Sequence, residues 1–363
     1  MGFTLAGALD EFVDAATDPA RWTSALEAAS DATGSYGAIL VPVRSKLPNF
    51  SASPSVELAH ESYINDGWIH RDVRYGVEPF IRSRGAGSEA DFMTADQIAR
   101  APFYQEFLAP HKLRWFAGVK MAAGDEVWCL SLQRSIAQGP FQPHEIDELA
   151  FYSKSLGGVI ALSRSLGLAR AEGALAAFEA ADTGAVMLDR NGEMILINPA
   201  AERLLGPDLT LRKRRLVSFD QRATEVLDRA LHELLWRPDT LSVSQPVPMP
   251  RREGRPILAY PMRLRGVTVD ALSPCQAIVL LVGLDQRRPL PDTVLRLCFK
   301  LTAAEARLAV LIGAGTDLDA ACETLQIGHA TARTQLKLIF AKTGVHRQSE
   351  LVALLARLLP AIA

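Results

Sequence analysis

The apolar positions of residues 301–359 recur at helical spacing in four successive segments. In the first segment Thr302 is followed three residues later by Glu305, which is the pattern of a capping box and predicts the start of a helix. Gly313 and Gly315 predict its end. We therefore expect a small all-α domain in this part of the chain.

The second and third segments have the lengths of a helix-turn-helix. Thr316 followed by Asp319 predicts a short helix that ends near Gln326, and a third helix is expected between Gly328 and Gly344. One face of the third helix is apolar and carries Ala332, Leu336, Ile339 and Phe340. The opposite face carries Thr331, Arg333, Thr334, Lys337 and Lys342.

A fourth helix, predicted over residues 347–359, is apolar around more of its circumference than a three-helix core can cover. Its apolar residues are Leu351, Val352, Leu354, Leu355, Leu358 and Leu359. We expect the surplus leucines, Leu355 first among them, to face outward and to pair two protomers into a homodimer.

The charge pattern of this domain favours nucleic acid. No Asp or Glu lies between Glu323 and Glu350, and four cations fall in that gap, namely Arg333, Lys337, Lys342 and Arg347. Long cationic side chains on one helix face suit the major groove, where they reach guanine acceptors and phosphates. Four cations also occur on the solvated face of an ordinary helical bundle, so charge alone leaves both interpretations open.

The same stretch resembles, without a gap, the LuxR/FixJ-type helix-turn-helix of bacterial transcription regulators. The shared positions are Leu301, Thr302, Glu305, Gly315, Glu323, Leu325, Ile327, Thr331, Leu336, Ile339, Phe340, Lys342, Gly344, Val345 and Glu350. The chain departs from the family at Gln326, where a turn glycine is usual, and at Ala332, Gln335 and Thr343.

This resemblance implies double-stranded DNA as a partner, a third helix in the major groove and a fourth helix that pairs protomers. RNA polymerase is a further candidate partner. The positions implied to face base edges are Arg333, Thr334 and Lys337, and those implied to lie near the DNA backbone are Thr331 and Lys342.

Residues 175–285 have a separate organisation of strands and short helices. Strand patterns at 185–189 and 194–197 flank a hairpin signal, Asn198 followed by Pro199 predicts a helix start, and a helix is expected over 221–236. Three further strands are expected, at 241–248, 255–264 and 276–284. This order is similar to a PAS domain, a resemblance that implies a bound ligand, a cofactor or a dimerisation platform. No residue identifies the cofactor, which stays unknown.

Residues 1–142 have the pattern of an α/β sensor domain. Helices are expected at 5–17, 19–33, 55–64 and 94–108, and strands at 36–43, 115–122 and 126–134. The order resembles a GAF domain or the autoinducer-binding domain that precedes many LuxR-type helix-turn-helices. The resemblance implies a small-molecule ligand. Its candidate pocket residues are Tyr63, Trp68, Asp72, Trp115 and Trp128. Plain core packing of these aromatic residues is the alternative.

A long helix is expected over residues 143–182, with an apolar seam at Ile146, Leu149, Leu156 and Ile160. We interpret it as a signalling helix that joins the sensor domain to the PAS-like domain and pairs protomers. The alternative is a helix that packs only on its own domain.

Composition limits the remaining choices. The 363 residues suggest two or three domains, and 48% hydrophobic with 22% charged residues is ordinary for a globular protein. The net charge is −2, whereas residues 286–363 hold ten Lys or Arg against six Asp or Glu, so the cationic surplus is local. We find no signal peptide and no apolar run of about eighteen residues, and expect a cytoplasmic protein without membrane contact.

No catalytic motif is present, so we do not expect an enzyme. Four scattered cysteines, Cys129, Cys275, Cys298 and Cys322, predict small buried apolar residues and no metal site. We expect GAF-like and then PAS-like α/β sensor domains (1–142 and 175–285), joined by the helix 143–182, ahead of an all-α DNA-binding domain (291–363). Together they would form a ligand-responsive transcription regulator. The alternative is a sensor or adaptor that acts through protein–protein interaction and uses its C-terminal helices only to dimerise.

Overall fold

The computed structural model of the protein describes residues 3–43, 51–124, 126–236, 244–264, 272–285 and 291–358. The chain divides into two compact units, residues 1–252 with 256–282, and residues 283–363 with 253–255. Residues 241–243 of one predicted strand, and Leu359 of the last predicted helix, lie outside the described residues. No helix in the described ranges is both long and apolar enough to span a bilayer.

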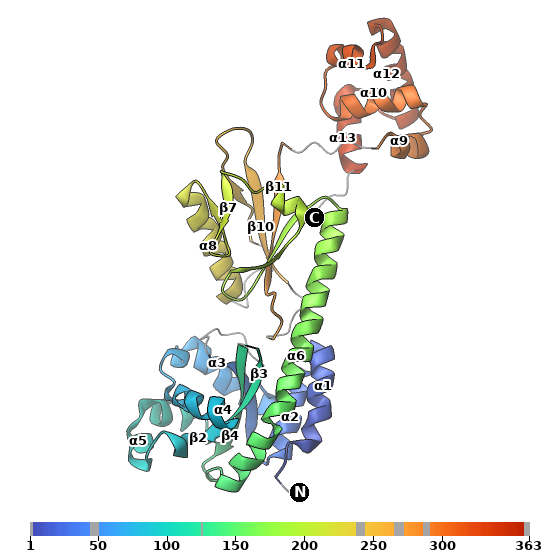
Figure 1. The fold of residues 1–363 in the computed structure, drawn as a ribbon. Helices are drawn as coiled ribbons and strands as arrows, with labels where there is room; N and C mark the ends of the chain where they lie inside the picture. The colour runs from blue at the N-terminus through green and yellow to red at the C-terminus, as the bar shows by residue number, and fades with distance from the viewer. Residues whose placement is uncertain are drawn as a thin grey trace. The chain divides into compact units, whose positions relative to one another are not determined.

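A four-stranded antiparallel sheet organises the N-terminal part of the first unit (Figure 1). Its spatial order is β1-β4-β3-β2, and its strands are β1 (Gly37–Pro42), β2 (Ala86–Ser88), β3 (Leu113–Ala123) and β4 (Glu126–Ser135). The three predicted strands are confirmed. β2 was not predicted, because three small residues carry no alternation of apolar and polar side chains.

Short helices surround this sheet. They are α1 (Leu9–Thr17), α2 (Trp22–Ala32), α3 (Glu57–Asn65), α4 (Glu78–Arg84), α5 (Ala95–Arg100), a π-helix η7 (Phe103–Leu108) and the turns η3 (Pro54–Val56), η4 (Trp68–His70), η5 (Val73–Val77) and η6 (Glu89–Asp91). The single helix predicted over 94–108 is wrong, since α5 ends at Arg100. Pro102 excludes the helical conformation of Ala101, which is extended at φ −73° and ψ 125°.

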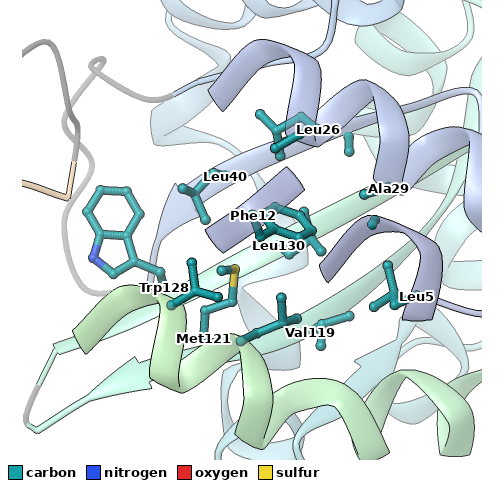
Figure 2. Packing of buried hydrophobic residues seen from close by; sticks show 14 of the residues in the cluster. Leu5, Phe12, Leu26, Ala29, Leu40, Val119, Met121, Trp128 and Leu130 are labelled. Atoms are coloured by element: carbon teal, nitrogen blue, oxygen red, sulfur yellow. The ribbon is translucent and has the colours of Figure 1, made fainter. Parts of the chain in front are cut away.

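The two faces of the sheet have separate cores, because successive side chains of a strand point to opposite sides. One face packs against α1, α2 and the first half of α6 (Pro143–Ala180). Figure 2 shows Met121, Trp128 and Leu130 of this face in one cluster with Phe12, Leu26 and Leu40. The other face is covered by α3, α4 and η7.

The predicted long helix is confirmed as α6, which is continuous over 38 residues. Leu149, Leu156 and Ile160 belong to the core of the first sheet, whereas Ala171 and Leu175 pack on a second sheet. The helix therefore packs on both sheets of the first unit.

The second sheet has five strands in the order β6-β5-β11-β10-β9. Its strands are β5 (Gly184–Leu188), β6 (Met194–Ile197), β9 (Val247–Met249), β10 (Ile257–Arg263) and β11 (Ala277–Gly283). The hairpin between β5 and β6 is confirmed, and Asn198 Oδ1 accepts from Ala201 N at 2.9 Å to cap α7 (Pro199–Glu202). The helix α8 (Gln221–Trp236), also predicted, and a hairpin of β7 (Leu209–Arg212) and β8 (Arg215–Ser218) cover one face of this sheet.

The second unit is all-α in its described part. Its helices are α9 (Asp292–Phe299), α10 (Ala303–Gly313), α11 (Leu318–Leu325), α12 (His329–Thr343) and α13 (Gln348–Leu358). The last four match the predicted helices, and α9 is an addition.

Three predictions need correction. Asp317, and not Thr316, caps α11, because its carboxylate accepts from Ala320 N at 2.8 Å. Leu355 does not face outward: it is 1% exposed and fills the core against Gly313. Cys298 is exposed, whereas Cys129, Cys275 and Cys322 are buried as expected.

Candidate nucleic-acid interface and ligand cavity

The start of α10 is fixed by the predicted capping box. Glu305 N donates to Thr302 Oγ1 at 3.3 Å, and Thr302 N donates to Glu305 Oε2 at 2.7 Å. Lys342 Nζ on α12 donates to the same carboxylate oxygen at 2.7 Å. Burial opposes ionisation of Glu305, but the bonds from Lys342 and Thr302 outweigh it and lower the pKa of this carboxyl. The cap of one helix therefore also anchors the end of another.

The turn between α11 and α12 passes through Gln326. This residue adopts φ +54° and ψ 44°, the left-handed conformation for which glycine is usual. Gln326 N donates to Glu323 O and Ile327 N donates to Cys322 O, so the turn closes as in a glycine-capped helix. The departure from the family pattern therefore leaves the turn in place and adds local strain.

The helix α12 presents a polar face. Thr331, Arg333, Thr334 and Lys337 are exposed, and Ala332 and Ile339 are buried on the opposite side. Four of the five predicted DNA-binding side chains are thus available to a partner, and the N-cap Gly328 leaves the first-turn N–H groups without a side-chain cap. Such groups are donors to a phosphate.

Lys342 differs from those four residues. Its ammonium group pairs with the Glu305 carboxylate, whose side chain is 5% exposed. A contact of Lys342 with a DNA phosphate would have to compete with this pair.

A cavity of about 60 Å³ lies on the other side of the molecule's first sheet from Trp128, between the strands and the α3–η7 layer. Ile39, Val41, Phe116 and Cys129 line it from the sheet. Its polar lining consists of His60, Tyr63, Asp72, Arg74, Tyr75, Glu78, Ser131 and Gln133. At about 10–15 Å³ for one water, it holds a few water-sized groups.

An ion pair forms part of the lining of this cavity. Arg74 Nη2 lies 2.8 Å from Asp72 Oδ2, and the Tyr63 hydroxyl donates to the same oxygen at 3.0 Å. Arg74 Nη1 donates to Gln133 Oε1 on β4 at 2.9 Å. Burial disfavours the charged guanidinium, but Asp72 outweighs it and raises the pKa of Arg74. The charges of Asp72 and Arg74 thus cancel, and Glu78, the second carboxylate of the lining, accepts from Arg82 Nε at 2.7 Å.

Burial also shifts the neighbouring groups toward their neutral forms. It lowers the pKa of His60 to about 4, and it raises that of Tyr75 and that of the Cys129 thiol each to about 12. Burial and the negative charge of Asp72 raise the pKa of Tyr63. At neutral pH the cavity therefore offers neutral hydrogen-bonding groups around the ion pair.

Of the five residues predicted from the sequence for a ligand pocket, Tyr63 and Asp72 line the cavity. Trp68 stacks on Phe107 with ring centroids 5.6 Å apart, in the layer that covers the cavity. Trp115, near the start of β3, lines a different cavity, and Trp128 is 1% exposed in the core of the opposite face. The structure therefore does not bring the three tryptophans together.

Sequence reasoning missed Arg74. The only sequence signal for it is its spacing two residues after Asp72 in a segment rich in aromatic residues. No group of three metal-ligating side chains occurs among the residues that the structure describes.

Comparisons with known proteins give limited similarity. None of the curated proteins matches the sequence. Several solved structures are similar at low sequence identity, among them the following three. Vibrio cholerae VqmA, described as a dimer in the absence of target DNA, is 17% identical, covers 48% of this chain and 82% of its own, and has a TM-score of 0.20. The phage VqmA–DPO complex is 15% identical over 52% and 87%, with a TM-score of 0.24. The E. coli DhaR(N)–DhaL complex is 16% identical over 76% and 87%, with a TM-score of 0.23.

At these TM-scores the three structures carry no argument on function. The match that bears on this chain is to a protein family: residues 175–240 are similar to the PAS domain. They include α7, α8 and the first strands of the five-stranded sheet, where the sequence predicted a PAS-like order.

Proposed function

We propose that the protein is a sequence-specific DNA-binding transcription regulator. In this proposal residues 291–363 are a LuxR-type DNA-binding domain, and residues 1–142, GAF-like or autoinducer-domain-like, and 175–285, PAS-like, are sensors. The observation that carries the proposal is the exposed face of α12, on which Arg333, Thr334 and Lys337 stand without a neighbouring carboxylate in the sequence from 324 to 349. A bidentate arginine contact with guanine is the commonest specific contact in the major groove.

Selection of bound sequences from a random DNA pool by the full chain tests this proposal directly. Arg333→Ala and Lys337→Ala should each weaken binding to the selected site by roughly 1–3 kcal/mol. Arg307→Ala on α10 is a matched control, since its guanidinium already donates to Ala303 O. Unchanged affinity of both α12 variants would contradict the groove assignment. Absence of any salt-dependent DNA binding would favour the adaptor alternative.

We further propose that α13 pairs two protomers, so that the bound sites have two-fold character. Because Leu355 belongs to the core, the half-buried Leu354 is the residue to test. Leu354→Glu should reduce dimerisation in sedimentation experiments and leave the helical content unchanged. A wild-type chain that stays monomeric on DNA would contradict this part.

The proposed sensory role rests on the cavity beside Asp72 and Arg74. Because the two charges cancel, the expected ligand is small and neutral, with hydrogen-bonding groups at one end and an apolar body. The cavity of about 60 Å³ has room for only a few water-sized groups, so a ligand larger than this would bind only if the cavity widened.

A ligand regulates DNA binding only if it binds the active and inactive arrangements with different affinity, and coupling of about 1–3 kcal/mol is typical. Insertion of two glycines after Ser163, within α6, should leave ligand binding intact and abolish its effect on DNA affinity. If the inserted chain responded to ligand as the wild type does, α6 would not carry the signal.

A further inference from the structure

A second cavity, of about 210 Å³, opens at the β2 edge of the first sheet. It is lined by Ser88, Glu89, Ala90, Met93, Ala95, Ile98, Arg114, Trp115, Pro140 and Phe141. These residues come from the end of β2, from η6 and α5, from the start of β3 and from the two positions just before the N-cap of α6. None of them lines the cavity beside Asp72, so the two sites are separate.

Two neighbouring side chains of the lining, Arg114 and Trp115, carry hydrogen-bond donors. Trp115 Nε1 is buried and finds no acceptor among the described residues. The Arg114 guanidinium lies 5.3 Å from the centroid of the Trp115 ring, so a cation stands beside this unused donor. A buried N–H without an acceptor is unfavourable, and a bound acceptor would remove that penalty.

Glu89 is the one acidic side chain of the lining, and it is 3% exposed. Its Oε1 accepts from Phe116 N at 2.6 Å. Burial outweighs these backbone bonds and the nearby arginines and raises the pKa of Glu89 to about 8. The carboxyl is therefore mostly protonated at neutral pH and does not repel an anion.

The rest of the lining is apolar and sets the size of an occupant. Met93, Ile98 and Phe141 form the walls, and the volume lies below the about 300–1,000 Å³ that is usual for drug-sized ligands. An occupant with the dimensions of a single substituted ring fits this description.

We propose that this cavity binds a small organic carboxylate, with its anionic end between Arg114 and the Trp115 indole N–H and its apolar body against Met93, Ile98 and Phe141. The inference extends the sensory part of the proposed function to a second ligand class. Its test does not involve DNA, so that failure of either proposal leaves the other open to measurement.

Benzoate is the probe, and benzyl alcohol is its neutral counterpart. The chain has five tryptophans, so a ¹⁵N-labelled sample gives five indole N–H signals, and the loss of one signal in Trp115→Phe assigns it. Benzoate should shift the Trp115 signal saturably, and benzyl alcohol should bind at least roughly tenfold more weakly, because hydrogen bonds to a charged group are the stronger ones.

Isothermal titration calorimetry measures the affinity of the variants: Arg114→Gln should weaken benzoate binding by roughly tenfold or more, and Trp115→Phe by roughly threefold to tenfold. Arg100→Gln is the matched control, since Arg100 is exposed on α5 and does not line the cavity. The proposal is overturned if the Trp115 signal does not move, if benzyl alcohol binds equally well, or if Arg114→Gln and Arg100→Gln bind benzoate alike.

Discussion

Two pairs of cations, one pair in each unit of the chain, differ in their surroundings. In the first unit the side chains of Arg74 and Arg134 are largely buried and bonded to Asp72 and Glu145, each pair at 2.8 Å, whereas in the second unit Arg333 and Lys337 of α12 are exposed. A buried pair fixes the geometry around it and leaves no net charge for a partner, and an exposed cation contributes little to folding. The same residue type thus serves structure in one unit and, in the proposed function, recognition in the other.

Among substitutions that test this comparison, Arg74→Met should have the largest effect on stability. It leaves the Asp72 carboxylate buried without its counter-charge and should lower the free energy of unfolding by about 3–5 kcal/mol. All five tryptophans lie in the first unit, so tryptophan fluorescence during urea unfolding reports on it alone. Arg71→Met, at a side chain that is exposed over the Trp68 ring, is the control and should change stability by less than about 1 kcal/mol. Equal effects of the two substitutions would contradict the structural role of the pair.

In the second unit, stability resides in apolar packing. Leu355→Ala removes a side chain from the core beside Gly313 and should destabilise the unit by about 2–5 kcal/mol, whereas Leu354→Ala should have a smaller effect. Hydrogen exchange of the α10 and α13 backbone amides in the full chain measures both. If Leu354→Ala proved the more damaging, the assignment of Leu355 to the core would be wrong.

Glu89 shows how burial changes the pKa of a carboxyl group that is hydrogen-bonded to the backbone and not paired with a cation. Between its ordinary pKa of 4.5 and about 8, the folded chain holds a proton that the unfolded chain has released. The free energy of unfolding should therefore fall as the pH rises through this interval, by on the order of a few kcal/mol. Glu89→Gln should lose this pH dependence and be the more stable chain near pH 8, whereas Glu57→Gln, exposed on α3, should keep it. A wild-type chain equally stable at about pH 5 and about pH 8 would argue against the shift.

Lys342 is partly exposed, as the other cations of α12 are exposed, but it is also paired with a buried carboxylate, as Arg74 and Arg134 are. Lys342→Met removes the partner of Glu305 and should destabilise the second unit by about 1–2 kcal/mol, whereas Lys337→Met should leave stability nearly unchanged. Hydrogen exchange at the start of α10 distinguishes the two variants. Because the pKa of Glu305 is lowered in the folded chain, the wild-type advantage should disappear as the pH falls through that carboxyl's range.

The smallest expected effect is an increase in stability, caused by a substitution at Gln326. Gln326→Gly relieves the left-handed conformation at φ +54° and should stabilise the turn by about 0.5–1 kcal/mol, seen as slower exchange at the end of α11. Thr343→Gly is the contrasting change, since Thr343 is helical and glycine there should destabilise α12 by a similar amount. A loss of stability in Gln326→Gly would show that the glutamine side chain holds the turn.

Local signals in the sequence predicted most elements, because caps and turns depend on residues a few positions apart. Thr302 with Glu305 and Asn198 with Pro199 are examples. What the sequence could not decide is which side of an element meets which neighbour. Trp128 and Cys129 are adjacent and point to opposite faces of β4, and only the packed sheet shows that the cavity lies on the side of Cys129.

The sequence also could not predict which residues pair with the charged side chains. Arg74 and Gln133 are 59 positions apart, and Lys342 and Glu305 are 37 apart, so no periodicity connects them. The face of α13 that carries Leu355 was misassigned for the same reason, since a leucine-rich helix does not reveal which of its leucines meets Gly313.

Because α6 is continuous, the number of residues between its two contact regions fixes the angle, about the helix axis, between the faces that meet the two sheets. One unbroken rod of 38 residues, about 57 Å at 1.5 Å per residue, carries Leu156 against one sheet and Leu175 against another. At 3.6 residues per turn, one added residue turns one contact face by about 100° relative to the other, while four added residues bring it back to within about 40°. The effect of insertions in α6 should therefore vary with the period of the helix. The number of residues in α6 determines the relative rotation of its two contact faces as well as the distance between them.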